Sequence, residues 1–486
     1  MSAQDEESAR GRNGIVVQPR IGLTETLTDN VSQSSTSKDA ALVTQVSPGI
    51  HIESRAGRVR GTFDYALNGV LYTGSPTANQ TQHTLAAKGA VELIENSVYV
   101  DAQASINQQT ISAFGQQSSS NVLSNANRTE VASVNVSPYW RGRLGDVASF
   151  ELRAFGTATN QKESISGDSH TEGASLRLNG LNSGQIQWWA SLSSQDSHFR
   201  AGSGSSSQST IANLGLNYRP DVDLSLTISG GPERNDYGGG EMRNSSNYGA
   251  SATWTPSPRT QLTGEWQHHD YGNAHTLSFE HRRARSVWRY SDVKSVTLGT
   301  PNGTTAGTTL YNLFYQQCVA TQTDPASCPT VVTAYLLALG LDPNMILSSG
   351  FVASAPTSQR LQDLSFSLQG MRTTLMFSLT QSTSSLLSGA AATGDLAQSS
   401  FVRQRGFALS LSHGLTPISS VQATFSMSRN SGDIASLSNT LRSLAANWSS
   451  SFGRRLSVSL GARHSDFSGA SGYTENALIA NLVQQF

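Results

Sequence analysis

Residues 131–144 read VASVNVSPYWRGRL, and apolar and polar side chains alternate along most of this stretch. One face of an extended chain here would carry Val134, Val136, Pro138, Trp140 and Leu144, and the other would carry serine, asparagine, tyrosine and arginine. A period of two residues predicts a β-strand. The stretch is longer than the roughly 5–6 residues of most strands in water-soluble proteins. It suits a tilted strand that crosses a bilayer, which needs about 9–11 residues.

The same alternation recurs in residues 222–229, 421–429 and 455–463. Its polar face carries small hydroxyls, amides and arginine, so it faces water and not a second core. A water-soluble sandwich also alternates, but a chain of this length would then need several separate cores. The sequence therefore predicts an all-β fold: a single transmembrane antiparallel β-barrel of about twenty strands (18–22). Short turns alternate with longer polar loops such as FGQQSSSNVLSNAN, residues 114–127.

Composition narrows the function classes. The chain has 486 residues, of which 14% are charged, and a formal net charge of −1. Near-neutral charge gives no reason to expect nucleic acid as a partner. No apolar run reaches the roughly 18 residues of a transmembrane helix. The polar residues 1–13 are expected to be a disordered N-terminal segment, with the secretion signal already removed. We expect a multi-pass β-barrel of the bacterial outer membrane, in contact with its lipid.

The alternation divides the chain after residue 13 into three parts. Residues 14–294 are predicted to form the first part of the barrel, and residues 360–486 are predicted to form the last part. Between them, residues 295–359 lose the alternation and are predicted to be a partly helical loop or plug that enters the lumen or caps one mouth; a surface excursion without a gating role is the alternative. Cys318 and Cys328 lie in this insertion, and their spacing suits a small disulfide loop worth roughly 2–3 kcal/mol. Such a bond implies an oxidising compartment such as the periplasm.

Catalytic chemistry has little support. Residues 267–275 contain His268, His269, Asp270 and His275, but alternation places His268 and His269 on opposite faces of a strand. No nucleophile elbow, phosphate-binding loop or zinc-protease motif occurs in the sequence. We therefore predict a non-enzyme without catalytic residues, metal or cofactor.

The predicted lumen face is rich in arginine. The arginines expected there are Arg58, Arg60, Arg141, Arg143, Arg153, Arg177, Arg282, Arg372, Arg455 and Arg463. Charged rings in a pore select solutes, although mutual pairing with acidic neighbours is the simpler interpretation for most of these residues. Aromatic residues near strand ends are expected to form interfacial girdles: Tyr139, Trp140, Trp188, Trp189, Trp254, Trp266, Trp288 and Tyr290.

The last ten residues, ALIANLVQQF, predict a final strand with Leu478, Leu482 and Phe486 on one side. A terminal phenylalanine resembles the signal by which the barrel-assembly machinery recognises its clients. Gln484 stands where that signal usually has a second aromatic residue. This strand would pair with the first strand and leave no free edge.

Two short motifs near the N-terminus carry a family resemblance. They are Thr28-Asp29-Asn30-Val31 and the segment VTQVSPGI at residues 43–50. With the sequence up to about residue 290, they resemble the PEP-CTERM system-associated outer-membrane β-barrel proteins. The resemblance implies a role in export or assembly of an exopolysaccharide, with polysaccharide and periplasmic export components as partners. Two other functions stay open: a general or substrate-selective diffusion porin, and a structural sheath for a partner such as a multihaem cytochrome.

Overall fold

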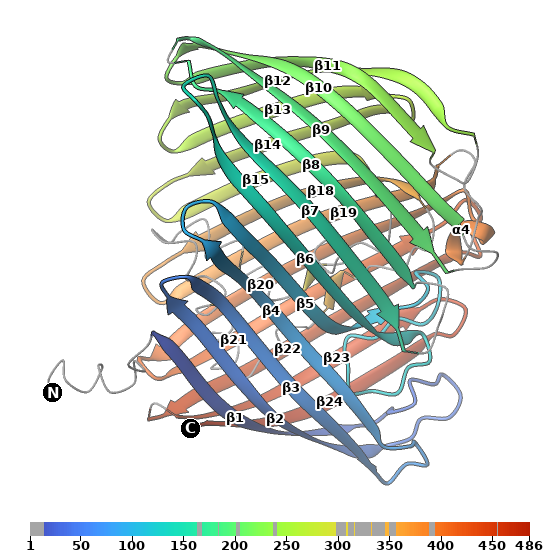
Figure 1. Ribbon diagram of the computed structural model, residues 1–486. Helices are drawn as coiled ribbons and strands as arrows, with labels where there is room; N and C mark the ends of the chain where they lie inside the picture. The colour runs from blue at the N-terminus through green and yellow to red at the C-terminus, as the bar shows by residue number, and fades with distance from the viewer. Residues whose placement is uncertain are drawn as a thin grey trace, which may run out of the picture.

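The computed structural model describes residues 14–162, 168–182, 184–200, 205–236, 241–297, 356–387, 394–453 and 455–486, together with 308–309, 315, 332 and 346–348. Its main feature is one 22-stranded antiparallel sheet that closes into a barrel (Figure 1). Within this sheet each strand pairs with the next in chain order, including β15 with β18 across the insertion, and β1 also pairs with β24, where Leu23 lies opposite Leu482. The prediction of a single all-β barrel of 18–22 strands is confirmed.

The strands of the first part of the barrel are β1 (Ile15–Thr28), β2 (Ala41–Ala56), β3 (Val59–Thr73), β4 (Gln80–Ile94), β5 (Val98–Thr110), β6 (Arg128–Leu144), β7 (Ala148–Gln161), β8 (Ser169–Gly180), β9 (Ile186–Phe199), β10 (Ser205–Asp221), β11 (Leu224–Asp236), β12 (Arg243–Ser257), β13 (Thr260–His269), β14 (Gly272–Arg282) and β15 (Ser286–Thr297). The last part contains β18 (Thr357–Gln369), β19 (Thr373–Leu386), β20 (Phe401–Thr416), β21 (Ser419–Ser431), β22 (Ser438–Phe452), β23 (Leu456–Ser468) and β24 (Tyr473–Gln485). One short helix, α4 (Asp395–Gln398), lies between β19 and β20.

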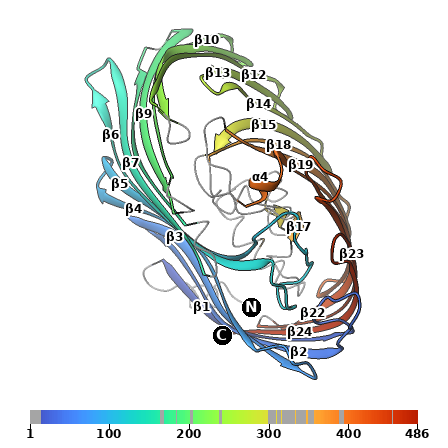
Figure 2. The same ribbon diagram turned by 90° about the vertical axis from the view of Figure 1, so that its right-hand side faces the viewer.

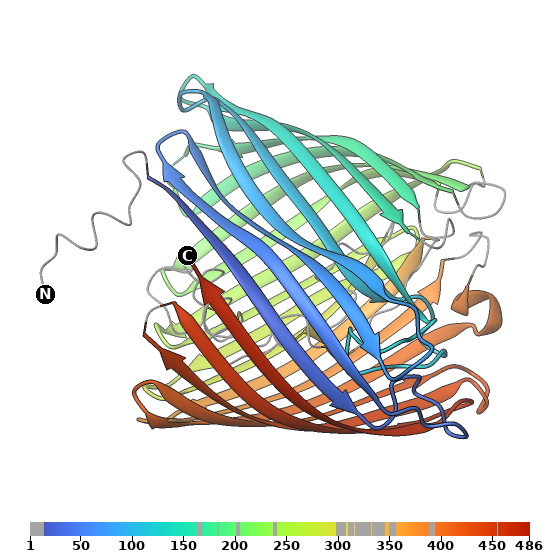
Figure 3. The ribbon, with the colours of Figure 1, turned by 90° about the horizontal axis from the view of Figure 1, so that it is seen from below.

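The two ends of the barrel differ in their connections. At one end, which we call the turn end, tight turns such as residues 95–97 and 370–372 join the strands. At the other, the loop end, the connections include residues 29–40, 111–127 and 387–400. Figure 3 shows the first and last strands side by side, with the start of β1 and the end of β24 both at the turn end. In outer-membrane barrels short turns are periplasmic and longer loops extracellular.

The outer wall is apolar. In β6, Val134, Val136 and Trp140 are 49%, 43% and 51% exposed, whereas Ser133 and Ser137 between them are buried. A fold in water would bury the valines and expose the serines. A closed barrel with an apolar outer band and a polar inner wall is the arrangement that suits a bilayer. No helix among the described residues is long and apolar enough to cross a membrane.

The insertion between β15 and β18 is described only in small pieces. Two short strands, β16 (Thr308–Thr309) and β17 (Ile346–Ser348), pair with each other. β17 lies inside the ring of barrel strands and contacts β20 and β21 (Figure 2). Most of the segment expected to be helical, and both Cys318 and Cys328, lie outside the described residues, so the helices and the disulfide stay predictions.

Candidate functional site in the barrel lumen

Residues 111–127, the connection between β5 and β6, fold into the barrel at its loop end (Figure 2). We call this segment the inner loop. The Tyr72 hydroxyl on β3 donates a hydrogen bond of 2.7 Å to the carbonyl of Val122, and the Ser119 and Ser465 hydroxyls lie 2.7 Å apart. The sequence predicts an ordinary long loop here. The structure instead seats it on the lumen side of the wall.

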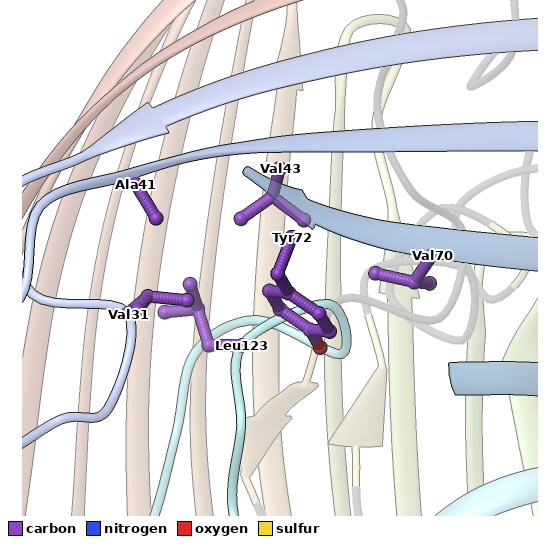
Figure 4. Close-up of a cluster of buried hydrophobic side chains, with 6 residues drawn as sticks. All are labelled: Val31, Ala41, Val43, Val70, Tyr72 and Leu123. Carbon is purple, nitrogen blue, oxygen red and sulfur yellow. The ribbon is translucent and has the colours of Figure 1, made fainter. Parts of the chain in front are cut away.

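An apolar cluster holds the middle of the inner loop (Figure 4). Leu123, 2% exposed, packs with Val31, Val43, Val70 and Tyr72. Val43, Val70 and Tyr72 occupy lumen-facing positions that are polar in most of the barrel. This local loss of polarity on the inner face of β2 and β3 is the sequence signal that would have revealed a seat for another segment.

The inner loop also contacts the last strands. Asn430 on β21 and Asn439 on β22 both donate to the Ala113 carbonyl, at 2.9 and 2.8 Å. The Tyr473 hydroxyl on β24 donates to the Gln117 carbonyl at 2.8 Å. Because Tyr72 and Tyr473 lie on opposite sides of the β1–β24 junction, the inner loop bridges the seam at which the barrel closes.

A buried carboxylate anchors the start of the inner loop. Asp395 of α4 accepts hydrogen bonds from the Ser112 hydroxyl at 2.5 Å and from the Ala113 amide at 2.6 Å. Burial raises the pKa of Asp395, although both hydrogen bonds oppose that shift. Asp395 is 4% exposed, so we expect a change in its protonation to change the stability of inner-loop docking.

The inner loop is stiffened by its own polar side chains. The Asn127 amide donates to the carbonyls of Ser112 and Gln116, at 2.8 and 3.0 Å. The Arg128 guanidinium donates to the carbonyls of Ser118 and Ser120. These bonds satisfy backbone groups that have no strand partner, which allows an irregular segment to lie against the wall.

A second feature of the lumen lies nearer the turn end, on β5 to β9. The Tyr99 and Tyr139 rings stack with centroids 5.0 Å apart. The Arg141 guanidinium lies 4.2 Å from the centroid of Tyr99, and that of Arg153 lies 4.0 Å from the centroid of Tyr139. Further along, Arg177 lies over the Trp189 ring at 5.3 Å. We call Tyr99, Tyr139, Arg141, Arg153, Arg177 and Trp189 the arginine–aromatic track.

Alternation places the track on the inner face. Tyr139 is next to the outward-facing Trp140 in the strand, and Trp189 is next to Trp188, which pairs with the outward-facing Leu216. The expectation that Tyr139 and Trp189 belong to a lipid-facing girdle is therefore wrong, because neighbouring strand residues face opposite sides. The other aromatic residues of that set face outward: Trp140, Trp188, Trp254, Trp266, Trp288 and Tyr290.

Glycine makes room for the track. A Cβ added at Gly215, which lies opposite Trp189, would come within 2.3 Å of the indole ring. The missing side chain lets the indole lie across the neighbouring strand, with the Arg177 guanidinium over the ring.

The arginines predicted to line the lumen divide into two groups. Strand positions on the inner face hold Arg60, Arg141, Arg143, Arg153, Arg177, Arg282 and Arg463, whereas turns or strand ends at the turn end hold Arg58, Arg372 and Arg455. Several are neutralised by carboxylates: Arg153 by Asp101 and Glu151, Arg282 by Glu280, Arg463 by Glu475, and Arg58 by Glu95. The described part of the wall therefore presents both ion-paired arginines and arginines without a carboxylate partner, the latter being Arg60, Arg141, Arg143 and Arg177.

The histidine-rich hairpin has a structural role. The His269 ring lies 2.8 Å from the buried Glu233 carboxylate, and the Asp270 amide also donates to that carboxylate. His268 lies opposite the outward-facing Tyr248, on the other face of the strand. Burial raises the pKa of Tyr271 in this turn to about 12. The described residues contain no group of three potential metal ligands.

The residues of the expected C-terminal signal lie on the outer surface. Leu478, Leu482 and Phe486 are 61%, 40% and 63% exposed. The Phe486 amide donates to the Pro19 carbonyl at 3.0 Å, which extends the pairing of β24 with β1.

Comparisons with known proteins identify the fold. No family model and no curated protein matches the chain. Among solved structures, the FrpB iron transporter from Neisseria meningitidis is similar: the F3-3 variant has a TM-score of 0.52 and 11% identity, covering 100% of this chain and 83% of that chain. The F5-1 variant gives 0.52 and 11%, with 100% and 84% covered. This chain has the large closed β-barrel fold of these two structures. At such low identity the similarity shows the fold and not the cargo.

Proposed function

We propose that this protein guides a polysaccharide through the barrel lumen, as a non-enzymatic component of exopolysaccharide export or assembly. The resemblance of residues 28–31 and 43–50 to PEP-CTERM system-associated barrels supports this proposal. The structural observation that carries the proposal is the arginine–aromatic track, because a sugar chain binds to flat aromatic rings and to fixed hydrogen-bonding groups.

The chemistry of the track suits sugars. The C–H face of a pyranose ring is apolar and packs on an aromatic face, whereas its hydroxyls require donors and acceptors. Tyr99, Tyr139 and Trp189 supply the rings, and a sugar would replace the guanidinium groups that lie over them. Asp101, Glu151 and Arg153 supply acceptors and donors beside them, with Arg153 2.9 Å from Asp101.

The arrangement favours passage over retention. The groups lie on adjacent strands, which are about 4.8 Å apart, so successive contacts are closely spaced along the wall. The Arg153 charge is balanced by Asp101 and Glu151, and Arg141 and Arg177 are hydrogen-bonded to the neutral Tyr99 and Asn179, so the track is built from several modest contacts. Conduction needs several weak sites of this kind and not one tight site.

The test uses planar bilayers that contain the purified full-length barrel. Dextran and alginate oligosaccharides serve as neutral and acidic probes of current block. We expect Tyr139→Ala to weaken block by about tenfold, as the loss of one stacking contact would. The matched control is Trp140→Ala, which removes a larger ring from the lipid-facing side of the same strand and should leave block unchanged. Equal block by Tyr139→Ala and the wild type, or no block by either sugar, would contradict the proposal.

Uptake of an iron complex is a second candidate. The observation in its favour is the fold of FrpB, which is described as an iron transporter. Barrels of 22 strands are also the size class of outer-membrane transporters whose lumen is filled. Binding of a ferric complex with no sugar-dependent block would favour this candidate.

Steady ohmic current without block would favour a diffusion porin, and a Soret band in the purified protein would favour a cytochrome sheath.

A further inference from the structure

Four arginines gather on the outer face of β20, β21 and β22: Arg403, Arg405, Arg429 and Arg442. We call them the outer arginine patch. They face away from the lumen, because their strand neighbours Val402, Gln404, Asn430 and Ser443 are buried on the inner side. Register places Arg405 directly opposite Arg429, and Arg442 lies two residues beyond Thr440, the partner of Arg429.

This juxtaposition leaves positive charge largely uncompensated. Like charges directly opposite each other destabilise a strand pair. Arg405 donates to the neutral Gln381 amide at 2.8 Å, and Arg442 lies 3.5 Å from Asp466. Among the described residues, neither Arg403 nor Arg429 has a carboxylate partner, and Arg403 Nε is buried without a hydrogen-bond acceptor.

Another nearby acidic group, Asp433, is engaged elsewhere. The Asp433 carboxylate, in the connection after β21, accepts hydrogen bonds from the Ser399 hydroxyl and the Ser400 amide, at 3.0 and 2.9 Å. On the inner face, by contrast, Arg153 and Arg463 pair with carboxylates. Within the outer arginine patch, Arg442 is thus the member that has a carboxylate partner, Asp466, and Arg403, Arg405 and Arg429 form no ion pair among the described residues.

Its depth in the membrane is defined by the apolar wall. The last apolar outward residues before Arg405, Arg429 and Arg442 are Phe407, Met427 and Leu444, each two residues closer to the turn end. Two residues rise about 6.6 Å along a strand, or roughly 5 Å along the membrane normal at a tilt near 40°. Because the patch lies toward the loop end, this level is that of the headgroups of the outer leaflet.

The wall directly below the patch is suited to acyl chains. The rings of Phe377, Phe407 and Phe425 form a row across β19, β20 and β21, with successive centroids 5.7 and 5.8 Å apart. A row of outward rings beneath a cluster of guanidinium groups matches a molecule that carries a phosphate above hydrocarbon.

We propose that the outer arginine patch binds the phosphate groups of an anionic lipid in the outer leaflet, with its acyl chains on the phenylalanine row. Guanidinium groups bind phosphate through two parallel hydrogen bonds, which lysine cannot do. A phosphate between Arg405 and Arg429 removes their mutual repulsion. This inference is independent of what passes through the lumen.

The experiment measures lipid binding to the full-length barrel in neutral detergent by native mass spectrometry. The probe is hexa-acylated diphosphoryl lipid A, with the monophosphoryl form and inorganic phosphate as comparison ligands. We expect the double variant R405Q/R429Q to bind the diphosphoryl lipid about tenfold or more weakly than the wild type, because two charge-assisted sites are lost. Lys294→Gln, a loss of positive charge on the outer face of β15 outside the patch, should leave affinity unchanged.

Two further measurements test whether the loss of binding comes from the lost guanidinium groups and whether the acyl chains contribute. Heat-modified mobility in gels shows whether R405Q/R429Q is folded; if it is not, R405K/R429K, which keeps the charge, takes its place and should bind with intermediate affinity. Equal affinity of the folded double variant and the wild type would overturn the proposal. So would binding of inorganic phosphate that displaces the lipid completely, because the acyl chains would then contribute nothing.

Discussion

Replacement of Leu123 by alanine tests whether the inner loop is held by its apolar seat. The side chain is 2% exposed and packs among Val31, Val43, Val70 and Tyr72. The substitution therefore loses the full transfer free energy of the atoms that it removes. Loss of three carbons at about 0.8 kcal/mol each, with a modest cavity term, gives roughly 3 kcal/mol. Since about 1.4 kcal/mol corresponds to a factor of ten, the docked loop should become about a hundredfold less favoured over undocked forms.

Hydrogen exchange followed by mass spectrometry measures this change directly. Protection of amides in residues 111–127 should fall by about a hundredfold in Leu123→Ala, while amides of the barrel strands keep theirs. Ile434→Ala is the control, because it removes a comparable volume from a side chain that is 54% exposed in another loop. Unchanged protection in a folded Leu123→Ala barrel would refute the reasoning, and so would an equal loss in the control.

Two other predictions follow from the same structure. Burial raises the pKa of Asp395 in the docked state. The stabilisation of docking by the protonated carboxyl is therefore complete below the unfolded pKa of 3.8 and is lost as the pH rises through the higher folded pKa. Protection factors of inner-loop amides should increase on acidification in the wild type and should not change with pH over that window in Asp395→Asn. The stabilisation by Asp433 has the opposite pH dependence and is lost at lower pH, because a hydrogen bond from the Ser400 amide lowers the pKa of Asp433. If the protection factors of Asp395→Asn still change with pH, another group causes the effect. Deletion of Phe486 should lower the amount of folded barrel in the outer membrane several-fold, with Phe486→Tyr as the control that keeps an aromatic ring, and normal insertion after the deletion would remove this residue from the assembly signal.

The lumen combines two features at different depths. The inner loop spans the β1–β24 seam at the loop end, where Tyr72 and Tyr473 hold it from either side. The arginine–aromatic track lies closer to the turn end, with Tyr139 and Arg153 in contact. Under the proposed function, a sugar chain that enters at the turn end meets the track before it reaches the inner loop.

The strands and their faces could be predicted from the sequence alone. Alternation in residues 131–144 is a local property, and it correctly placed Val134, Val136 and Trp140 on the outside. It also placed His268 and His269 on opposite faces of one strand, which removed the metal interpretation. The all-β class, the single barrel and the range of strand numbers depend only on such local patterns and on their repetition.

Only the tertiary structure showed that the inner loop lies in the lumen and which charged side chains lie opposite each other. Ser119 and Ser465 are 346 residues apart, and Asn430 reaches the Ala113 carbonyl across 317 residues, so no local pattern records that residues 111–127 lie inside the barrel. The register that sets Arg405 opposite Arg429 likewise depends on how two strands pair. Alternation assigns a side chain to a face, but contacts between distant segments arise when the sheet closes, because closure fixes the relative position of every strand.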